Sequence, residues 1–164
     1  MSGRTLAVSL CATIAIAGCG GGGGTSNKST TSATNTTETA PTRSKPKVRV
    51  PKGSPPKKLV IKDLIKGNGR TAQSGDQVNV QYVGVDYKSG KQFDASWDRG
   101  QAFPFQLGAG QVIPGWDKGV AGMRVGGRRE LIIPPALAYG SQGQPPAIGR
   151  NATLVFVIDL VADR

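Results

Sequence analysis

The sequence holds few side chains of the kinds that perform covalent or acid–base chemistry. It contains no histidine and only two cysteines in 164 residues. Ser96 and Ser141 have no partner base, so a serine hydrolase is not favoured. Without histidine or a cysteine pair a zinc site is not expected, and we predict no metal and no cofactor. What remains for function is a set of aromatic and small polar residues in the later part of the chain.

Cys19 is the one cysteine whose surroundings indicate a role. Arg4 is the sole charge before the uncharged run Leu6–Ala17, a layout typical of a secretory signal and too short to span a bilayer as a helix. The segment Ile16-Ala17-Gly18-Cys19 resembles the lipobox of bacterial lipoproteins. We therefore predict a signal peptide over 1–18 and a lipidated Cys19 that anchors the protein outside the cytoplasmic membrane. The alternative is an ordinary signal peptide with a chance cysteine.

Residues 19–56 are predicted to form a flexible linker rich in Gly, Ser, Thr, Pro and Lys. From Cys19 to Lys58 there are eight basic residues against Glu38 alone, which supplies most of the net charge of +11. This run carries no aromatic residue, so nucleic-acid binding is not predicted. Attraction of this basic run to an anionic membrane or wall surface is favoured over nucleic-acid binding. The most favoured interpretation is a solvated spacer that has no partner.

Residues 57–164 are predicted to form the one folded domain. Strand patterns cover 59–65, 78–83, 131–133 and 153–161, and they are separated by Gly, Asn and Ser turn signals. The one good helix pattern covers 114–120, with proline at its start. These patterns predict an α+β domain that has an antiparallel sheet and one short helix.

Six short motifs within this domain resemble successive motifs of the FKBP-type peptidyl-prolyl cis–trans isomerases. Their order and spacing match that family from about Lys57 to the C-terminus. The motifs are Tyr82-Val83-Gly84, Phe93-Asp94-Ala95-Ser96, Phe103-Pro104-Phe105, Gln111-Val112-Ile113-Pro114-Gly115-Trp116, Ala138-Tyr139-Gly140 and Ala152-Thr153-Leu154-Val155-Phe156.

The resemblance implies a curved antiparallel sheet wrapped around the short helix, with an apolar pocket between them. It implies that Trp116 forms the pocket floor, that the Ile113 N–H and the Tyr139 hydroxyl orient the ligand, and that Arg99 supports the pocket's Tyr and Asp. Residue by residue, it assigns a catalytic role to Tyr82, Phe93, Asp94, Tyr139 and Phe156, and substrate binding to Phe103, Val112, Ile113, Trp116 and Ile148.

The expected activity is acceleration of X–Pro bond rotation in proteins that fold outside the cytoplasmic membrane. The expected partners are Pro-containing polypeptides, with macrolides as candidate inhibitors, and a monomer is expected. Two alternatives stay open. The pocket can serve a non-catalytic Pro-peptide binding module or a tethered folding helper, or the domain can be a wall-anchoring structure without a ligand.

The chain departs from the family pattern at two places near the pocket. The loop 142–151 has Ala147 where a larger aliphatic residue is common and Gly149-Arg150 where two prolines are common. Trp97 stands where a polar residue is common, which makes it a candidate for extending the apolar rim.

Overall fold

The computed structural model of the chain describes residues 38–39 and 43–163, with side chains from residue 43 onward. The predicted signal peptide over 1–18 and the predicted lipidation residue Cys19 lie outside the described residues. Within the described part of the chain, no helix has the length and apolar character needed to cross a membrane.

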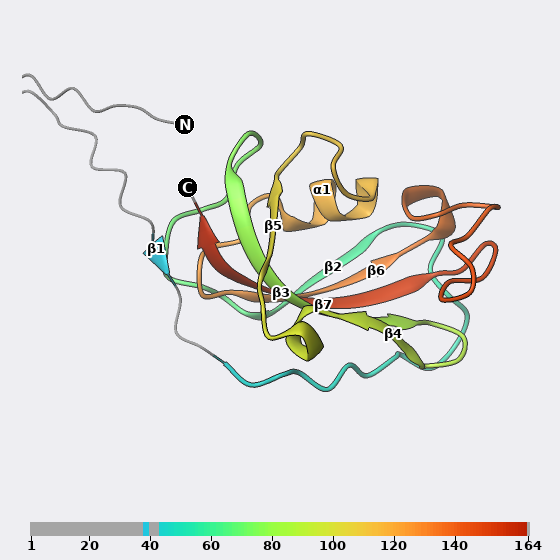
Figure 1. The fold of residues 1–164 in the computed structure, drawn as a ribbon. Helices are drawn as coiled ribbons and strands as arrows, with labels where there is room; N and C mark the ends of the chain where they lie inside the picture. The colour runs from blue at the N-terminus through green and yellow to red at the C-terminus, as the bar shows by residue number, and fades with distance from the viewer. Residues whose placement is uncertain (1–37, 40–42, 164) are drawn as a thin grey trace, which may run out of the picture. The chain divides into compact units, whose positions relative to one another are not determined.

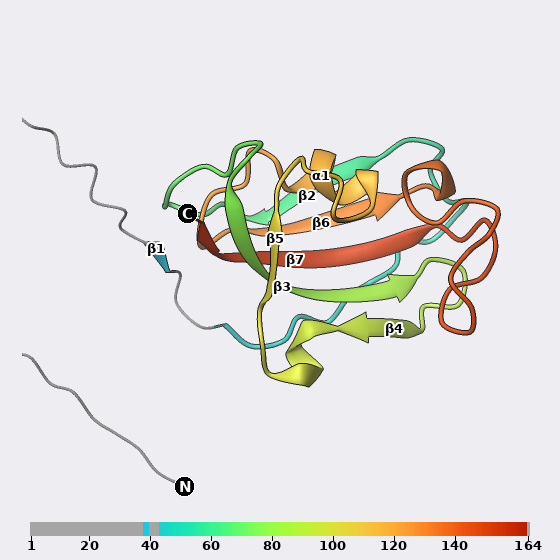
Figure 2. The ribbon, with the colours of Figure 1, turned by 45° about the horizontal axis from the view of Figure 1, so that its top comes forward.

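The domain is built on a seven-stranded sheet in which every strand pairing is antiparallel. Five strands follow the order β2-β6-β7-β3-β4, while β1 pairs with β7 and β5 pairs with β3 (Figures 1 and 2). The strands are β1 (Glu38–Thr39), β2 (Val60–Ile65), β3 (Gln77–Asp86), β4 (Gln92–Ala95), β5 (Phe103–Gln106), β6 (Arg128–Ile133) and β7 (Leu154–Asp163).

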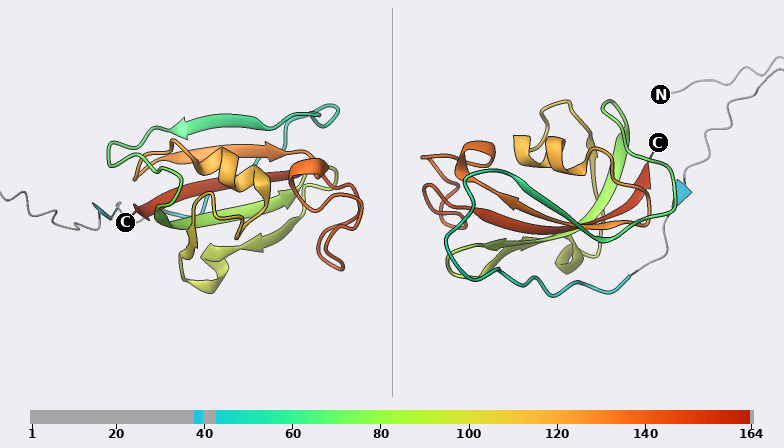
Figure 3. Two further views of the ribbon diagram at one scale, coloured as in Figure 1. Left: turned by 90° about the horizontal axis from the view of Figure 1, so that it is seen from above. Right: turned by 180° about the vertical axis from the view of Figure 1, so that it is seen from behind.

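One α-helix, α1 (Pro114–Val120), lies across one face of the curved sheet (Figure 3). Pro114 begins the helix, as the sequence predicts. A methyl group on Gly115 would come within 2.4 Å of the Ile133 side chain, and one on Gly119 within 2.5 Å of the Leu131 side chain. The two glycines therefore let α1 pack closely onto β6, and this approach closes the main core.

Two 3₁₀ helices complete the secondary structure of the described residues. The first, η1 (Ser96–Arg99), follows β4 and ends at Gly100, whose φ of 67° is left-handed. The second, η2 (Pro135–Leu137), follows β6 and leads to Tyr139. Leu137 of η2 packs against the main core, and Arg99 of η1 bonds Asp94 and Tyr82.

The central strand β7 is buried on both faces, in keeping with its apolar run over 154–158, and the buried Asp159 that follows this run is paired with Arg128. The face toward α1 forms the main core, which includes Val80, Leu107, Leu131 and Ile158. The opposite face forms a second core cluster, which consists of Val83, Val85, Tyr87, Ala95, Ile132 and Val155.

Residues 43–58, called the strap below, cover this second cluster. Val48 and Val50 pack against it, and Figures 1 and 3 show the strap running along the sheet face opposite α1. The strap forms no helix or strand. The structure therefore differs from the predicted flexible linker over 19–56, because residues 43–56 follow a defined path on the domain.

The antiparallel α+β fold with one short helix is as predicted, and α1 has the predicted bounds. Strand ends differ by a few residues. β6 begins at Arg128, three residues before the predicted strand, because Arg128 and Arg129 pair with Asp159 and Asp63 on the neighbouring strands. β5 was not predicted as a strand.

Candidate active site

A cavity of about 370 Å³ opens between α1 and the sheet. This volume lies within the range of roughly 300–1,000 Å³ that is usual for small-molecule pockets. Its walls come from β3, β4, β5 and β7, from the start of α1 and from the loop after η2. The lining residues are Tyr82, Phe93, Asp94, Phe103, Gln111, Val112, Ile113, Trp116, Tyr139 and Phe156.

Trp116 is the centre of the aromatic packing in this cavity. Its ring centroid lies 4.9 Å from that of Tyr82 and 5.2 Å from that of Phe156, and both pairs are edge-to-face. Phe105 supports the indole from the core side at 5.7 Å. Edge-to-face pairs are favourable beyond the area they bury, so the rings hold one another in place. The cavity therefore has a floor and walls that are fixed by mutual packing.

Gly84 allows two of these rings to meet. It pairs with Asp94 on β4 and with Phe156 on β7, so it lies under the cavity wall. A methyl group on Gly84 would come within 2.7 Å of both the Phe93 and the Phe156 rings. With glycine at this position the two ring centroids lie 5.5 Å apart.

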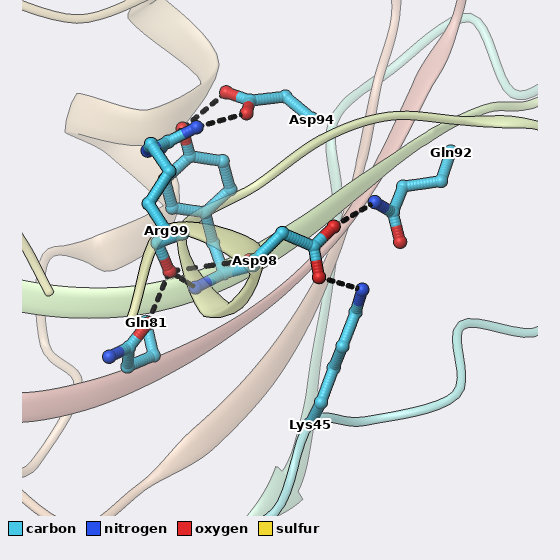
Figure 4. Close-up of polar contacts among 8 residues, drawn as sticks. Lys45, Gln81, Gln92, Asp94, Asp98 and Arg99 are labelled. Atoms are coloured by element: carbon cyan, nitrogen blue, oxygen red, sulfur yellow. Dashed lines mark hydrogen bonds and ion pairs between the residues drawn. The ribbon is translucent and has the colours of Figure 1, made fainter. Parts of the chain in front are cut away.

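Tyr82, Asp94 and Arg99 form a polar cluster at one side of the cavity. The Tyr82 hydroxyl donates a short hydrogen bond to Asp94, and Arg99 donates to Asp94 Oδ1 at 2.5 Å and to the Tyr82 oxygen at 2.8 Å (Figure 4). The guanidinium also lies 5.7 Å from the centre of the Tyr82 ring. Each member of the cluster is thereby held by the other two.

The charges of this cluster are set by its hydrogen bonds. Burial acts to raise the pKa of Asp94, but the hydrogen bonds from Tyr82 and Arg99 outweigh it and hold the pKa below its usual value. Burial, together with the hydrogen bond to Asp94, raises the pKa of Tyr82 to about 12. Asp94 is therefore an anion at neutral pH, and the Tyr82 hydroxyl keeps its proton.

Three further polar groups face or adjoin the cavity. Burial and the nearby Asp94 charge raise the pKa of Tyr139, and no described residue bonds its hydroxyl. Ile113 precedes α1, and its carbonyl accepts a hydrogen bond from the backbone N–H of Trp116 at 2.8 Å. The indole N–H of Trp116 is buried without a partner among the described residues. The Tyr139 hydroxyl is thus a donor that stays available to a ligand.

Nine of the ten residues assigned to the pocket from the sequence line this one cavity. Ile148 does not line it. Its side chain is 4% exposed and belongs to the main core beside Tyr82 and Trp116. Arg99 bonds Tyr82 and Asp94 from outside the lining.

Gln111 lines the cavity but was not assigned to it from the sequence. It begins the motif that contains Val112 and Ile113, which is the signal that could have included it. Trp97 does not extend the rim, since it packs against the second core cluster on the opposite sheet face. Among the residues the structure describes, no group of three acidic, His or Cys side chains is placed to hold a metal ion.

Comparison with known proteins adds family relationships to this geometry. Residues 68–161 match the model of the family described as FKBP-type peptidyl-prolyl cis-trans isomerase. The FK506-binding protein of Streptomyces anulatus is 59% identical over 119 residues, which cover 72% of this chain and 96% of the relative.

The chain belongs to the FKBP-type peptidyl-prolyl cis–trans isomerases.

Two further relatives agree with this membership. The probable FK506-binding protein of Corynebacterium glutamicum is 51% identical over 119 residues, which cover 72% of this chain and 98% of the relative. The crystal structure of AtFKBP13 is similar with a TM-score of 0.61 at 36% identity, and the match covers 65% of this chain and 93% of that chain. The curved sheet around one short helix is thus the FKBP fold, and the chain is a peptidyl-prolyl isomerase of this type.

Proposed function

We propose that this FKBP-type isomerase accelerates X–Pro bond rotation in proteins folding outside the cytoplasmic membrane, and that it does so by holding the prolyl ring in the aromatic cavity. The observation that carries this proposal is the cavity itself. Six aromatic rings border about 370 Å³ of open space, with Trp116 at the centre of the packing. They come from six parts of the chain: β3, β4, β5, α1, the loop after η2, and β7.

The reaction requires no nucleophile. Amide resonance gives the X–Pro bond partial double-bond character, so its rotation faces a barrier of roughly 18–20 kcal/mol. Resonance also places negative charge on the amide oxygen, which water stabilises in the planar form. An apolar cavity withholds that stabilisation from the planar amide, and the twisted transition state needs it less because its resonance is lost. A reduction of the barrier by about 5 kcal/mol would raise the rate nearly four powers of ten.

The side chains divide this work between them. Trp116 supplies the flat floor for the prolyl ring, and Tyr82, Phe93 and Phe156 exclude water from around the bond. The Tyr139 hydroxyl and the Ile113 N–H donate to substrate carbonyls and so fix the orientation of the peptide. Asp94 is charged and accepts hydrogen bonds from Tyr82 and Arg99, and these bonds keep the Tyr82 ring in one position.

A protease-free assay on an X–Pro peptide with the full chain tests this proposal. We expect the wild type to accelerate cis–trans exchange and a macrolide to abolish the acceleration by occupying the cavity. Asp94→Val removes the anion that holds Tyr82 and Arg99, and we expect kcat/KM to fall about tenfold. A wild-type chain that binds the peptide without accelerating exchange would instead be a Pro-peptide binding module.

We further propose that the protein is anchored by lipid on Cys19 at the outer side of the cytoplasmic membrane. The small residues before Cys19 and the uncharged run before them support this location. Cys19→Ser removes the acylation site and should release the protein into the soluble fraction, as measured by fractionation and immunoblotting. Retention of the Cys19→Ser variant in the membrane fraction would contradict the anchor without affecting the proposed reaction.

A further inference from the structure

The strap alternates between the sheet and the solvent in its first half. Pro46, Val48 and Val50 are partly buried, while Lys45, Lys47 and Arg49 are exposed. Val48 and Val50 pack on the second core cluster, to which Trp97 of η1 also packs. This period of two is the pattern of a segment with one covered face. The strap therefore has a fixed inward side, and that side meets the same cluster as η1.

Lys45 joins the strap to η1 directly. Its Nζ lies 2.5 Å from Asp98 Oδ1, and Gln92 of β4 donates to the other oxygen, Oδ2, at 2.7 Å (Figure 4). The hydrogen bond from Lys45 is the largest of the causes that lower the pKa of Asp98, followed by that from Gln92. Both oxygens of Asp98 are thus engaged on the strap side of η1.

The other residues of η1 reach the cavity. Ser96 is fully buried and accepts the Tyr82 backbone N–H at 2.8 Å. Arg99 donates to Asp94 at 2.5 Å and to the Tyr82 oxygen at 2.8 Å. On the strap side of η1, Trp97 packs on the second core cluster and Asp98 pairs with Lys45. On the pocket side, Ser96 and Arg99 bond Tyr82, and Arg99 also bonds Asp94. A displacement of η1 on the strap side must therefore move Arg99.

We propose that the strap is a positioning element of the active site, in which Lys45, Val48 and Val50 hold η1 so that Arg99 engages Asp94 and Tyr82. This inference rests on the proposed function, because it assigns the strap a role in the same pocket. Asp98 is the neighbour of Arg99 in sequence. The ion pair with Lys45 holds Asp98 on the strap side of η1, while Arg99 is bonded to Asp94 and Tyr82 on the pocket side.

The relatives give independent support for a strap that accompanies the domain. The matches to the Streptomyces and Corynebacterium proteins each cover 72% of this chain. Residues 59–164 alone are too few to account for that share. Each match therefore extends upstream of Leu59 into the strap, although the family model itself begins at residue 68.

Substitutions in the full chain test the inference with matched controls. Lys45→Met removes the ion pair, and Lys47→Met removes the same charge two residues later from an outward position. The double variant Val48→Ser with Val50→Ser weakens the packing of the strap on the second core cluster. Its control is Lys47→Ser with Arg49→Ser, which changes two exposed residues of the same segment. Two readouts are measured: kcat/KM for the X–Pro peptide, and the NMR resonances of the Arg99 guanidinium, which report its bonds to Asp94 and Tyr82 without any substrate.

We expect Lys45→Met and the double valine variant to shift the Arg99 resonances and to lower kcat/KM about two- to fivefold, with neither control doing so. Exchange of the charges, Lys45→Asp with Asp98→Lys, should restore both readouts. Arg99 resonances and kcat/KM that match the controls in both test variants would overturn the role of the strap. Failure of the wild type to isomerise the peptide would overturn the proposed function alone, since the Arg99 resonances still report on the strap.

Discussion

Asp94 organises the polar side of the pocket, although its side chain is 39% exposed. It accepts hydrogen bonds from Tyr82 and Arg99 on separate oxygens, and this arrangement fixes a phenol and a guanidinium at the cavity wall. Because the ion pair with Arg99 is partly solvated, its contribution to global stability is modest. Its importance is local, since the ring of Tyr82 borders the space that the prolyl ring is proposed to occupy.

The charge state of Asp94 leads to a prediction about pH. Its folded-state pKa lies below the ordinary value, so the stabilisation that it provides is fully present above about pH 4 and disappears as the pH falls through the lower folded value. The chain has no histidine, and the pKa of Tyr82 is about 12. We expect kcat/KM to be constant from about pH 5 to pH 9. A midpoint between pH 6 and 8 in the measured profile would contradict this assignment.

Tyr139 provides a prediction for a single hydroxyl. Tyr139→Phe keeps the ring in the cavity wall and removes the donor that no described residue uses. We expect kcat/KM to fall about two- to tenfold while the midpoint of thermal unfolding changes little.

Tyr87→Phe is the matched control for Tyr139→Phe. Tyr87 belongs to the second core cluster on the other sheet face, where its hydroxyl donates to the Ser54 carbonyl at 3.5 Å. Tyr87→Phe keeps the ring in this cluster and removes only a long bond to Ser54, which is not among the strap residues proposed to hold η1, so kcat/KM should stay unchanged. Equal losses in the two variants would show that the Tyr139 hydroxyl has no special relation to the substrate.

At the scale of elements, β3 positions the cavity wall through its register with β4 and β7. Gly84 lies between Asp94 and Phe156 in that register. Gly84→Ala would force the Phe93 and Phe156 rings apart or into the cavity, because each has an atom 2.7 Å from the added methyl position. We expect a loss of about 1–3 kcal/mol in the free energy of unfolding, measured by denaturant titration.

The same substitution should lower kcat/KM by a larger factor than its effect on folding explains, because both displaced rings line the cavity. Gly149→Ala is the control, since nothing lies within 4 Å of the added methyl group at that position. Retention of full activity by Gly84→Ala would mean that the spacing of these two rings is not important for the reaction.

The elements that the sequence predicted well are those with one dominant local signal. The helix 114–120 has a proline start, and β7 has a long β-branched run. β6 was predicted too short because its first residues, Arg128-Arg129-Glu130, are charged. The structure buries Arg129 to 8% exposure, and Arg129 donates to Asp63 at 2.6 Å and to the Gly119 carbonyl at 2.8 Å. These partners are distant in the sequence, so local patterns do not reveal them.

The strap was missed for a different reason. The alternation Lys45-Pro46-Lys47-Val48-Arg49-Val50 has the period of a half-buried extended segment, but it is short and lies in a basic, proline-rich run. Composition favoured a linker, and the sheet face that attracts Val48 and Val50 becomes evident only from the fold.

At the scale of the whole molecule, the sheet has the cavity on one face and the strap on the other. One face, with α1, forms the cavity, and the other face receives the strap through which the chain leads back toward Cys19. The strap therefore links the segment that precedes the domain to η1, whose Arg99 bonds the pocket residues Tyr82 and Asp94. The pocket residues were largely predictable from six motifs in register, whereas the coupling through η1 required the spatial proximity of Lys45 and Asp98.

Limited proteolysis tests the docking of the strap in the intact chain. Trypsin cleaves segments that unfold locally, so a docked strap should resist cleavage. We expect cleavage after Lys28 to precede cleavage after Lys47 or Arg49, as judged by mass spectrometry of the early fragments. In the double variant Val48→Ser with Val50→Ser this protection should be lost, so that cleavage after Lys47 or Arg49 becomes as fast as cleavage after Lys28. Equally rapid cleavage at all three sites in the wild type would show that the strap is not held on the sheet.

The most direct test of the proposed mechanism is NMR exchange spectroscopy of an X–Pro peptide with the labelled full chain. The two tryptophans give an internal control, because Trp116 is in the cavity and Trp97 packs on the opposite face. We predict that cis and trans peptide signals exchange much faster with the protein present, and that the indole N–H of Trp116 shifts on peptide addition while that of Trp97 does not. Unaccelerated exchange, or a shift confined to Trp97, would contradict catalysis in the aromatic cavity.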